Sequence, residues 1–256
     1  PASPAGTRRA PITDEQLREM MRDEEPSFLE RNSGRVGTLA LIAVNVVCFV
    51  AEMLISGTGQ DISILTLVQM GAMYAPMVQG PADLYRFVAP MFLHMDLMHL
   101  LFNMVALYSV GELLERVLGR GNFLLLYFVA GITGNVVSYA VDMAQGGGLS
   151  VSAGASTSVF GLFVAVALLC ALVRGNRAVF RDFSKSMLSI IAVNVIYTLL
   201  VPNISISGHL GGAIGGAIAM LLLPAASLRT PRPVRIVVAV LWVAAVAAVL
   251  VRGGVF

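Results

Sequence analysis

Apolar residues in this chain are gathered into long runs that are separated by short polar segments. A helix needs about 20 mostly apolar residues to cross a bilayer. Seven runs have or approach this length, and the fifth and sixth are the shortest. They predict an all-α polytopic membrane protein whose spans cover residues 36–56, 97–114, 123–141, 156–173, 187–201, 209–223 and 234–251.

The composition agrees with a membrane protein whose first partner is the lipid bilayer. Of the 256 residues, 57% are hydrophobic and only 12% are charged, which is about half the charged fraction of soluble domains. A net charge of +2 is too small to indicate a nucleic-acid partner. Cys48 and Cys170 both fall in apolar runs, so no disulfide framework is indicated.

Basic residues predict the orientation. Fifteen of the 17 Lys and Arg residues precede the first predicted span or fall in the loops after the second, fourth and sixth spans, leaving only Arg86 and Arg252 on the other side. Cytoplasmic loops carry such an excess. We therefore expect a cytoplasmic N-terminus and an outer C-terminus, which suits a bacterial cytoplasmic membrane.

The polar segments divide the chain into three parts. Residues 1–35 form a charged cytosolic segment with one short helix, "TDEQLREMMRDEE", and no cleavable signal peptide is expected there. Residues 36–228 form the core, in which the long outer loop 57–89 has an amphipathic middle that we expect to lie in the membrane interface. Residues 229–256 form the seventh helix and a short outer tail.

Unusual polar residues open the second, fourth and sixth spans, all at the predicted outer face. His99 and Asn103 share a helical face in the second span, Ser156 opens the fourth and His209 opens the sixth. All three histidines of the chain, including His94, lie at this depth. Because intramembrane ionisable groups are costly, they indicate a functional site.

Glycine spacing suggests how two of these residues meet. Gly212 and Gly216 belong to a row of small residues that lets the sixth span pack closely against a neighbour, and Gly154 and Gly161 could do the same for the fourth span, so that the two spans could pack on each other. This packing would bring Ser156 to His209, and an imidazole that accepts the hydroxyl proton makes a serine nucleophilic. Phe160, one turn after Ser156, could hold the imidazole by stacking.

The same spans offer donors for a developing oxyanion, which acyl transfer requires. The first N–H groups of a helix beginning at Ser156 lack intrahelical partners, and the Asn103 amide and His99 ring add further donors. Asp96 and Asp142 are the nearest acids, but neither is clearly placed to orient the base. We therefore predict a catalytic dyad.

These residues stand in motifs of a known family. "GASTSVFG", "HMDLMHLLFN" and "SGHLGGAIGG" closely resemble the signatures of rhomboid intramembrane serine proteases, and "DLYRFVAPMFLH" resembles the Trp-Arg element of their first outer loop. The resemblance covers about residues 36–225. It implies a rhomboid-like six-helix transmembrane core around a water-filled cavity open to the outside, with one additional C-terminal transmembrane helix.

The resemblance also implies roles for single residues. Ser156 would be the nucleophile and His209 the general base and acid, with His99 and Asn103 in the oxyanion site. The supporting residues would include Gly154, Phe160, Arg86, Gly212 and Gly216.

The chain departs from the family pattern in three places. Thr157 replaces the usual Gly after the serine and is expected to narrow the site. Tyr85 replaces the loop Trp and could still anchor at the interface. Phe160 stands where many members have Tyr, which keeps the stacking and loses the hydroxyl.

Structural explanations compete for several polar residues. Ser156 alone could be a helix-packing serine, and His99 with Asn103 an interhelical hydrogen bond. For His94 we expect a structural or loop-stabilising role. Asp96 is expected to be the N-cap of the second span. Glu52 is expected to be solvated or hydrogen-bonded to the loop. The methionines of the stretch 91–104 are expected to pack in the protein interior and not to bind a metal.

The expected function is endoproteolysis of transmembrane protein substrates at the outer face, without metal or cofactor. The alternative is a catalytically inactive rhomboid-like factor that binds membrane proteins, although such relatives typically lose the Ser or His. Three other functions are disfavoured. A transporter should show midplane charges or broken helices, and the sequence shows neither. A three-histidine metal site would leave Ser156 unexplained, and the nucleophile elbow of a soluble α/β-hydrolase needs Gly at the position of Ser158. The sequence indicates neither substrate identity nor oligomeric state.

Overall fold

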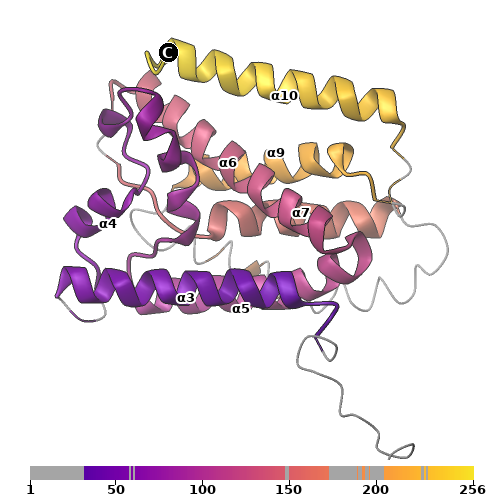
Figure 1. Cartoon of the computed structure of the whole chain (residues 1–256), viewed down its shortest axis with the longest axis horizontal. Coiled ribbons are helices and arrows are strands. Elements are labelled where there is room, and N and C mark those ends of the chain that lie inside the picture. The colour runs from indigo at the N-terminus through magenta and orange to yellow at the C-terminus, as the bar shows by residue number, and fades with distance from the viewer. Residues whose placement is uncertain are drawn as a thin grey trace, which may run out of the picture. The chain divides into compact units, whose positions relative to one another are not determined.

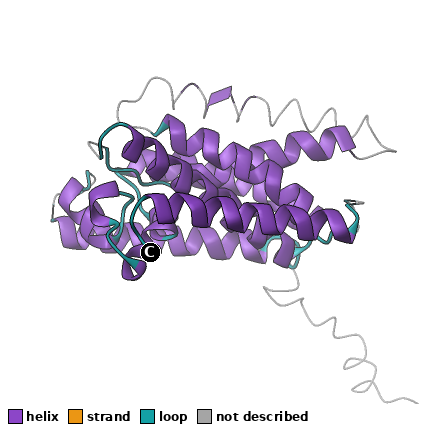
Figure 2. Ribbon diagram, turned by 90° about the horizontal axis from the view of Figure 1, so that it is seen from above, coloured by secondary structure: helices purple, strands orange, loops and turns teal. Residues whose placement is uncertain are grey.

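A computed structural model describes residues 32–57, 59, 61–147, 150–172, 205–225, 228 and 230–256, together with four isolated positions between 189 and 196. The chain divides into two compact units, Pro1–Ser33 and Gly34–Phe256. The second unit contains helices that run alongside one another in both ribbon views (Figure 1; Figure 2). Its main helices are α3 (Val36–Ser56), α5 (Leu97–Leu118), α6 (Arg120–Ala144), α7 (Ser156–Leu172), α9 (Ile206–Leu222) and α10 (Arg232–Arg252).

These helices confirm six of the seven predicted spans. Four of them, α3, α5, α6 and α10, are long and apolar enough to cross a membrane, and α7 and α9 are shorter apolar helices. The predicted span 187–201 and the short N-terminal helix fall largely or wholly outside the described residues. Among the described residues the only β pairing is two isolated bridges, Asp61 with Asp96 and Met73 with Ser152, so the all-α class is confirmed.

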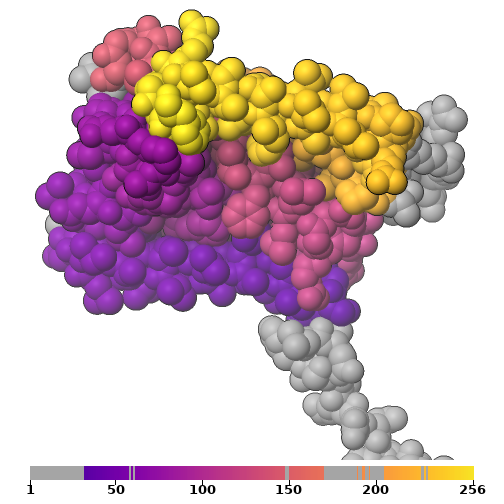
Figure 3. Space-filling view, turned by 45° about the horizontal axis from the view of Figure 1, so that its top comes forward, coloured from indigo at the N-terminus to yellow at the C-terminus, as the bar shows by residue number. Residues whose placement is uncertain are grey.

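Helix α6 is the most buried of the four long apolar helices, and α10 lies on the outside of the unit (Figure 3). Within an apolar window of 18 residues in each helix, 61% of the window is buried in α6, compared with 6% in α10. Trp242 on α10 donates from Nε1 to Thr133 Oγ1 of α6 at 2.9 Å, and the Tyr139 hydroxyl donates to Gly253 O at 3.2 Å. The seventh helix is therefore attached to α6 by side-chain contacts at two levels.

Missing side chains allow α9 to pack directly on the backbone of α7. A Cβ at Gly216 would lie 2.3 Å from Gly161 O, and one at Gly212 would lie 1.9 Å from Thr157 O. Ordinary contacts of a Cβ begin near 3.4 Å, so only glycine fits at these positions. The predicted close approach of these two spans is confirmed.

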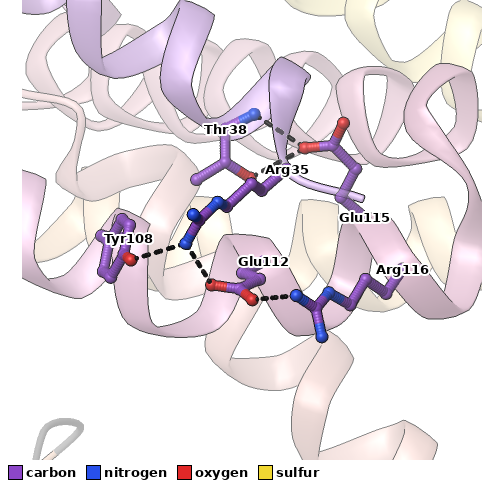
Figure 4. A network of polar contacts seen from close by, with 6 residues as sticks. All are labelled: Arg35, Thr38, Tyr108, Glu112, Glu115 and Arg116. Atoms are coloured by element: carbon purple, nitrogen blue, oxygen red, sulfur yellow. Dashed lines mark hydrogen bonds and ion pairs between the residues drawn. The ribbon is translucent and has the colours of Figure 1, made fainter. Parts of the chain in front are cut away.

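A buried carboxylate joins α3 to α5 at the end of the helices that carries the arginines (Figure 4). Glu115 is 2% exposed and accepts hydrogen bonds from Gly37 N, Thr38 N and Thr38 Oγ1 at 2.8, 2.8 and 2.9 Å. Around it, Arg35 donates to the Tyr108 hydroxyl, and Glu112 pairs with both Arg35 and Arg116. Its partners are distant in sequence, and no local pattern in the chain predicts this network.

The segment between α3 and α5, which the sequence predicts to be an outer loop, folds into short helical turns, α4 (Ile64–Met70), η1 (Ala75–Met77), η2 (Pro81–Phe87) and η3 (Ala89–Phe92). Arg86 is buried and donates from Nη1 to Val68 O at 2.9 Å and Ala72 O at 3.2 Å. Ile64 and Leu65 on α4 are exposed. A buried arginine thus holds the loop together, while the loop keeps an apolar surface, as expected for a segment in the membrane interface.

Candidate active site

The segment before α7 is fixed by backbone contacts with the outer loop. Ser152 forms a bridge with Met73, and Gly154 N donates to Pro90 O at 2.8 Å. Gly154 has a φ of +135°, and a Cβ there would lie 2.8 Å from the His99 ring. Only glycine combines this backbone conformation with this close contact, so Gly154 delivers Ser156 to the first position of α7.

The structure brings Ser156 and His209 together. His209 Nε2 and Ser156 Oγ lie 2.7 Å apart, a hydrogen-bonding distance at which a proton can pass from the hydroxyl to the ring. Phe160 stacks on His209 with ring centroids 4.2 Å apart and planes inclined by 4°. His209 is 4% exposed, so the imidazole is held between the serine and an aromatic face.

The two acids named in the sequence analysis are engaged elsewhere. Asp96 is the N-cap of α5 and accepts from His99 N at 2.8 Å, which confirms its predicted capping role. Asp142 accepts from the Ser150 hydroxyl at 2.9 Å. His209 Nδ1 is buried without a hydrogen-bond partner among the described residues. Within that part of the chain, no carboxylate or other polar group forms a hydrogen bond with Nδ1.

The two α5 side chains expected at the oxyanion site are both buried. The His99 ring lies against the turn at Gly154. The Asn103 Nδ2 donates to His99 O, one turn earlier, at 3.0 Å. Because an amide has two N–H groups, this bond leaves one donor of Asn103 for an incoming acceptor.

Comparison with known proteins agrees with these features. The rhomboid domain family matches residues 81–226, which is more than half of the chain. The chain belongs to the rhomboid family. The matched range contains α5, α6, α7 and α9, and thus Ser156, His209, Phe160, His99 and Asn103. The protein is therefore an integral multi-pass membrane protein with a rhomboid fold.

Three relatives illustrate the similarity. Rhomboid protease GluP of Bacillus subtilis is 38% identical over 192 residues, which are 74% of this chain and 35% of the relative. Putative rhomboid protease YdcA of the same bacterium is 35% identical over 138 residues, 54% of this chain and 66% of the relative. Rhomboid-like protease 3 of Toxoplasma gondii is 34% identical over 153 residues, 59% of this chain and 56% of the relative. The chain thus spans between about a third and two thirds of these relatives.

A buried carboxylate supports the active-site end of this rhomboid. Glu52 on α3 has no exposed surface and accepts from His94 N at 3.0 and 3.3 Å. Of the two expectations for Glu52, hydrogen bonding to the loop is confirmed and solvation is wrong. The His94 ring packs edge to face against the His99 ring, with centroids 5.2 Å apart. His94 therefore connects α3 to the site through His99.

Burial lowers the pKa of His94 well below its ordinary value, and the neighbouring His99 adds to the effect. His94 is therefore neutral near pH 7. Among the described residues, no three His, Cys, Asp or Glu side chains are grouped so that they could hold a metal ion.

Thr157 occupies a helix contact. Its side chain is buried. If Gly134 or Gly208 carried a Cβ, that atom would lie 2.9 Å or 3.3 Å, respectively, from the Thr157 side chain. The threonine therefore fills space between α7, α6 and α9. These contacts give no support to the expectation that Thr157 narrows the site.

Proposed function

We propose that this rhomboid is an intramembrane serine endopeptidase that hydrolyses peptide bonds in or near transmembrane segments of other membrane proteins. The observation that carries the proposal is the 2.7 Å contact between His209 Nε2 and Ser156 Oγ at the first turn of α7. The relatives named as rhomboid proteases support the same activity.

The proposed reaction has two halves. Ser156 Oγ attacks the carbonyl carbon of the scissile bond while His209 Nε2 takes the hydroxyl proton, and the imidazolium then gives this proton to the departing amine nitrogen. An ester now joins the substrate acyl group to Ser156. Water attacks this ester as His209 accepts a proton, and the proton returns to Ser156 Oγ when the acid leaves.

Three donors could stabilise the negative oxygen of the tetrahedral intermediate. They are the backbone N–H at Ser156, the free N–H of the Asn103 amide and the His99 ring. The first N–H groups of a helix have no intrahelical partner and lie at the positive end of its dipole. Removing one such donor from a hydrolase typically lowers kcat about 10²- to 10³-fold.

Packing would replace the acid of a triad in this site. The Phe160 ring, parallel to the imidazole at 4.2 Å, restricts rotation of His209 and leaves Nε2 directed at the serine. Nδ1 has no hydrogen-bond partner among the described residues, which agrees with a Ser–His dyad and not with a triad.

The distribution of charge supports an opening at the extracytoplasmic face. Ser156 and His209 lie in the first turns of α7 and α9, and His99 lies in the first turn of α5, whereas Arg116 lies in the last turn of α5, at the other end of that helix. If the arginine end is cytoplasmic, the site faces outward. A substrate helix must unwind there, because its intrahelical bonds hide the scissile carbonyl.

The test is cleavage of a tagged transmembrane reporter in liposomes by the parent, Ser156→Ala and His209→Ala proteins. The proposal expects cleavage by the parent and at least a 10³-fold lower rate in both variants. The alternative, an inactive factor that binds membrane proteins, expects equal capture of the reporter by all three proteins and cleavage by none. Cleavage that survives in Ser156→Ala would refute the proposed nucleophile.

A further inference from the structure

A groove lies between α10 and the core at the arginine end of the helices. It has a volume of about 450 Å³, which falls within the range of roughly 300–1,000 Å³ typical of small-molecule sites. Leu125 and Val129 of α6 and Leu222 of α9 line one side, and Trp242 of α10 lines the other. Because these residues are apolar, the deep part of the groove suits only an apolar ligand group.

Two arginines give the groove a positive end. Arg232 and Arg235 both line it, Arg232 exposed and Arg235 half-buried. Neither forms an ion pair within the described residues, and the first turn of α10 contains no acidic residue. The sequence has no Asp or Glu after Asp182. The positive charge at this end is therefore not neutralised by a neighbouring carboxylate along the chain.

The length of the groove matches one leaflet of a bilayer. Trp242 and Arg232 are ten residues apart on α10, which corresponds to about 15 Å along a helix. The hydrocarbon core of a bilayer is about 30 Å thick, so one leaflet contributes half of that thickness. A lipid whose headgroup meets the arginines would place its acyl chain along the groove as far as Trp242.

We propose that this groove binds an anionic phospholipid, with the phosphate at Arg232 and Arg235 and one acyl chain against α6 and α9. Arginine presents a fork of N–H donors that matches a phosphate, and basic pockets between membrane helices recognise anionic headgroups. A zwitterionic lipid would bring its own cation to the two arginines. The lipid would fill the space that α10 leaves beside the core at the arginine end.

The single tryptophan of the chain allows a direct test, since Trp242 lines the groove. The full chain in detergent is titrated with phosphatidylglycerol or phosphatidylcholine that carries brominated acyl chains, which quench tryptophan fluorescence on contact. We expect phosphatidylglycerol to reach half-maximal quenching at a mole fraction at least about 10-fold lower, from two arginine contacts. Equal quenching by the two lipids would overturn the proposal and leave only ordinary lipid contact.

Variants locate the headgroup and the chain separately. The double variant Arg232→Gln/Arg235→Gln is expected to remove the preference for phosphatidylglycerol, while Arg252→Gln at the other end of α10 leaves it unchanged. Ala239→Phe, which adds a ring to a residue lining the groove, is expected to reduce quenching by both lipids. Circular dichroism selects variants that keep the parent helix content. A preference that survives in the folded double variant would overturn the proposed headgroup site.

Discussion

Replacing Gly212 by alanine is expected to move α9 away from α7 and so separate the proposed base from its serine. Gly212 lies one turn after His209 on α9, against the carbonyl of Thr157, the residue that follows Ser156. The clash is with a backbone oxygen, so no side-chain rotation relieves it. The two helices must part, and they carry the two halves of the dyad.

The size of the displacement follows from the contact distances. The new Cβ would lie 1.9 Å from Thr157 O, whereas ordinary contacts begin at 3.4 Å. Because close-packed helices move as nearly rigid bodies, α9 would have to move away from α7 by up to about 1.5 Å. The His209–Ser156 contact of 2.7 Å would then exceed hydrogen-bonding distance. A misplacement of about 1 Å can cost 10²-fold in rate, so we expect kcat/KM to fall about 100-fold, or about 2.7 kcal/mol.

The assay measures kcat/KM for a transmembrane reporter in liposomes and, separately, the rate at which a fluorophosphonate labels Ser156. Gly121→Ala is the matched control, because Gly121 is helical and its Cβ would meet no atom within 4 Å. Thermal unfolding separates misplacement from misfolding, since overpacking costs about 1–3 kcal/mol. A Gly212→Ala protein that keeps activity within about threefold of the control would refute the claim that this contact positions the dyad.

Three further perturbations test other parts of the structure. Phe160→Ala should lower kcat about 3- to 10-fold with little change in KM, since an aromatic stack contributes about 0.5–1.5 kcal/mol, and steady-state kinetics measures this split. Glu115→Gln should destabilise the protein by about 1–3 kcal/mol in thermal unfolding, because a buried carboxylate accepts three hydrogen bonds there. Because the pKa of His94 is lowered in the folded state, that state binds fewer protons than the unfolded chain. The contribution of His94 to the free energy of unfolding should therefore fall as the pH drops below about 6.5, which thermal unfolding of the parent and His94→Gln proteins at several pH values measures.

Each of these has its own control. Phe160→Tyr retains the stack and should retain the parent kcat, so equal losses in Tyr and Ala variants would contradict the stacking role. Glu112→Gln alters a more exposed carboxylate of the same helix and should cost less than Glu115→Gln. His94→Gln should flatten the pH dependence, and an unchanged slope in that variant would assign the effect to another group.

Apolar patterning was sufficient to predict where the described membrane helices lie. The first predicted span coincides with α3, because Arg35 and Gly57 bound its apolar run. The second and third predicted spans fell short, since α5 and α6 continue through charged residues as far as Gly119, whose φ of +83° separates them. Charged residues ended these two predicted spans at the α5–α6 junction, whereas the helices themselves are separated by Gly119.

Partners distant in sequence account for what patterning could not predict. Glu115 accepts from Gly37, 78 residues away, and Glu52 from His94, 42 residues away. Nothing local distinguishes a carboxylate that will be buried from one that will be solvated, because the donors come from another helix. Ser156 and His209 could be paired because glycine spacing predicted that their helices meet.

The proposed chemistry can be tested most directly by mapping the adduct of a fluorophosphonate probe by peptide mass spectrometry, which requires no knowledge of the substrate. We expect a single phosphonylated residue, Ser156, in the parent protein and loss of this adduct in His209→Ala, because the hydroxyl then lacks its base. An adduct on another residue, or undiminished labelling of Ser156 without His209, would contradict the dyad.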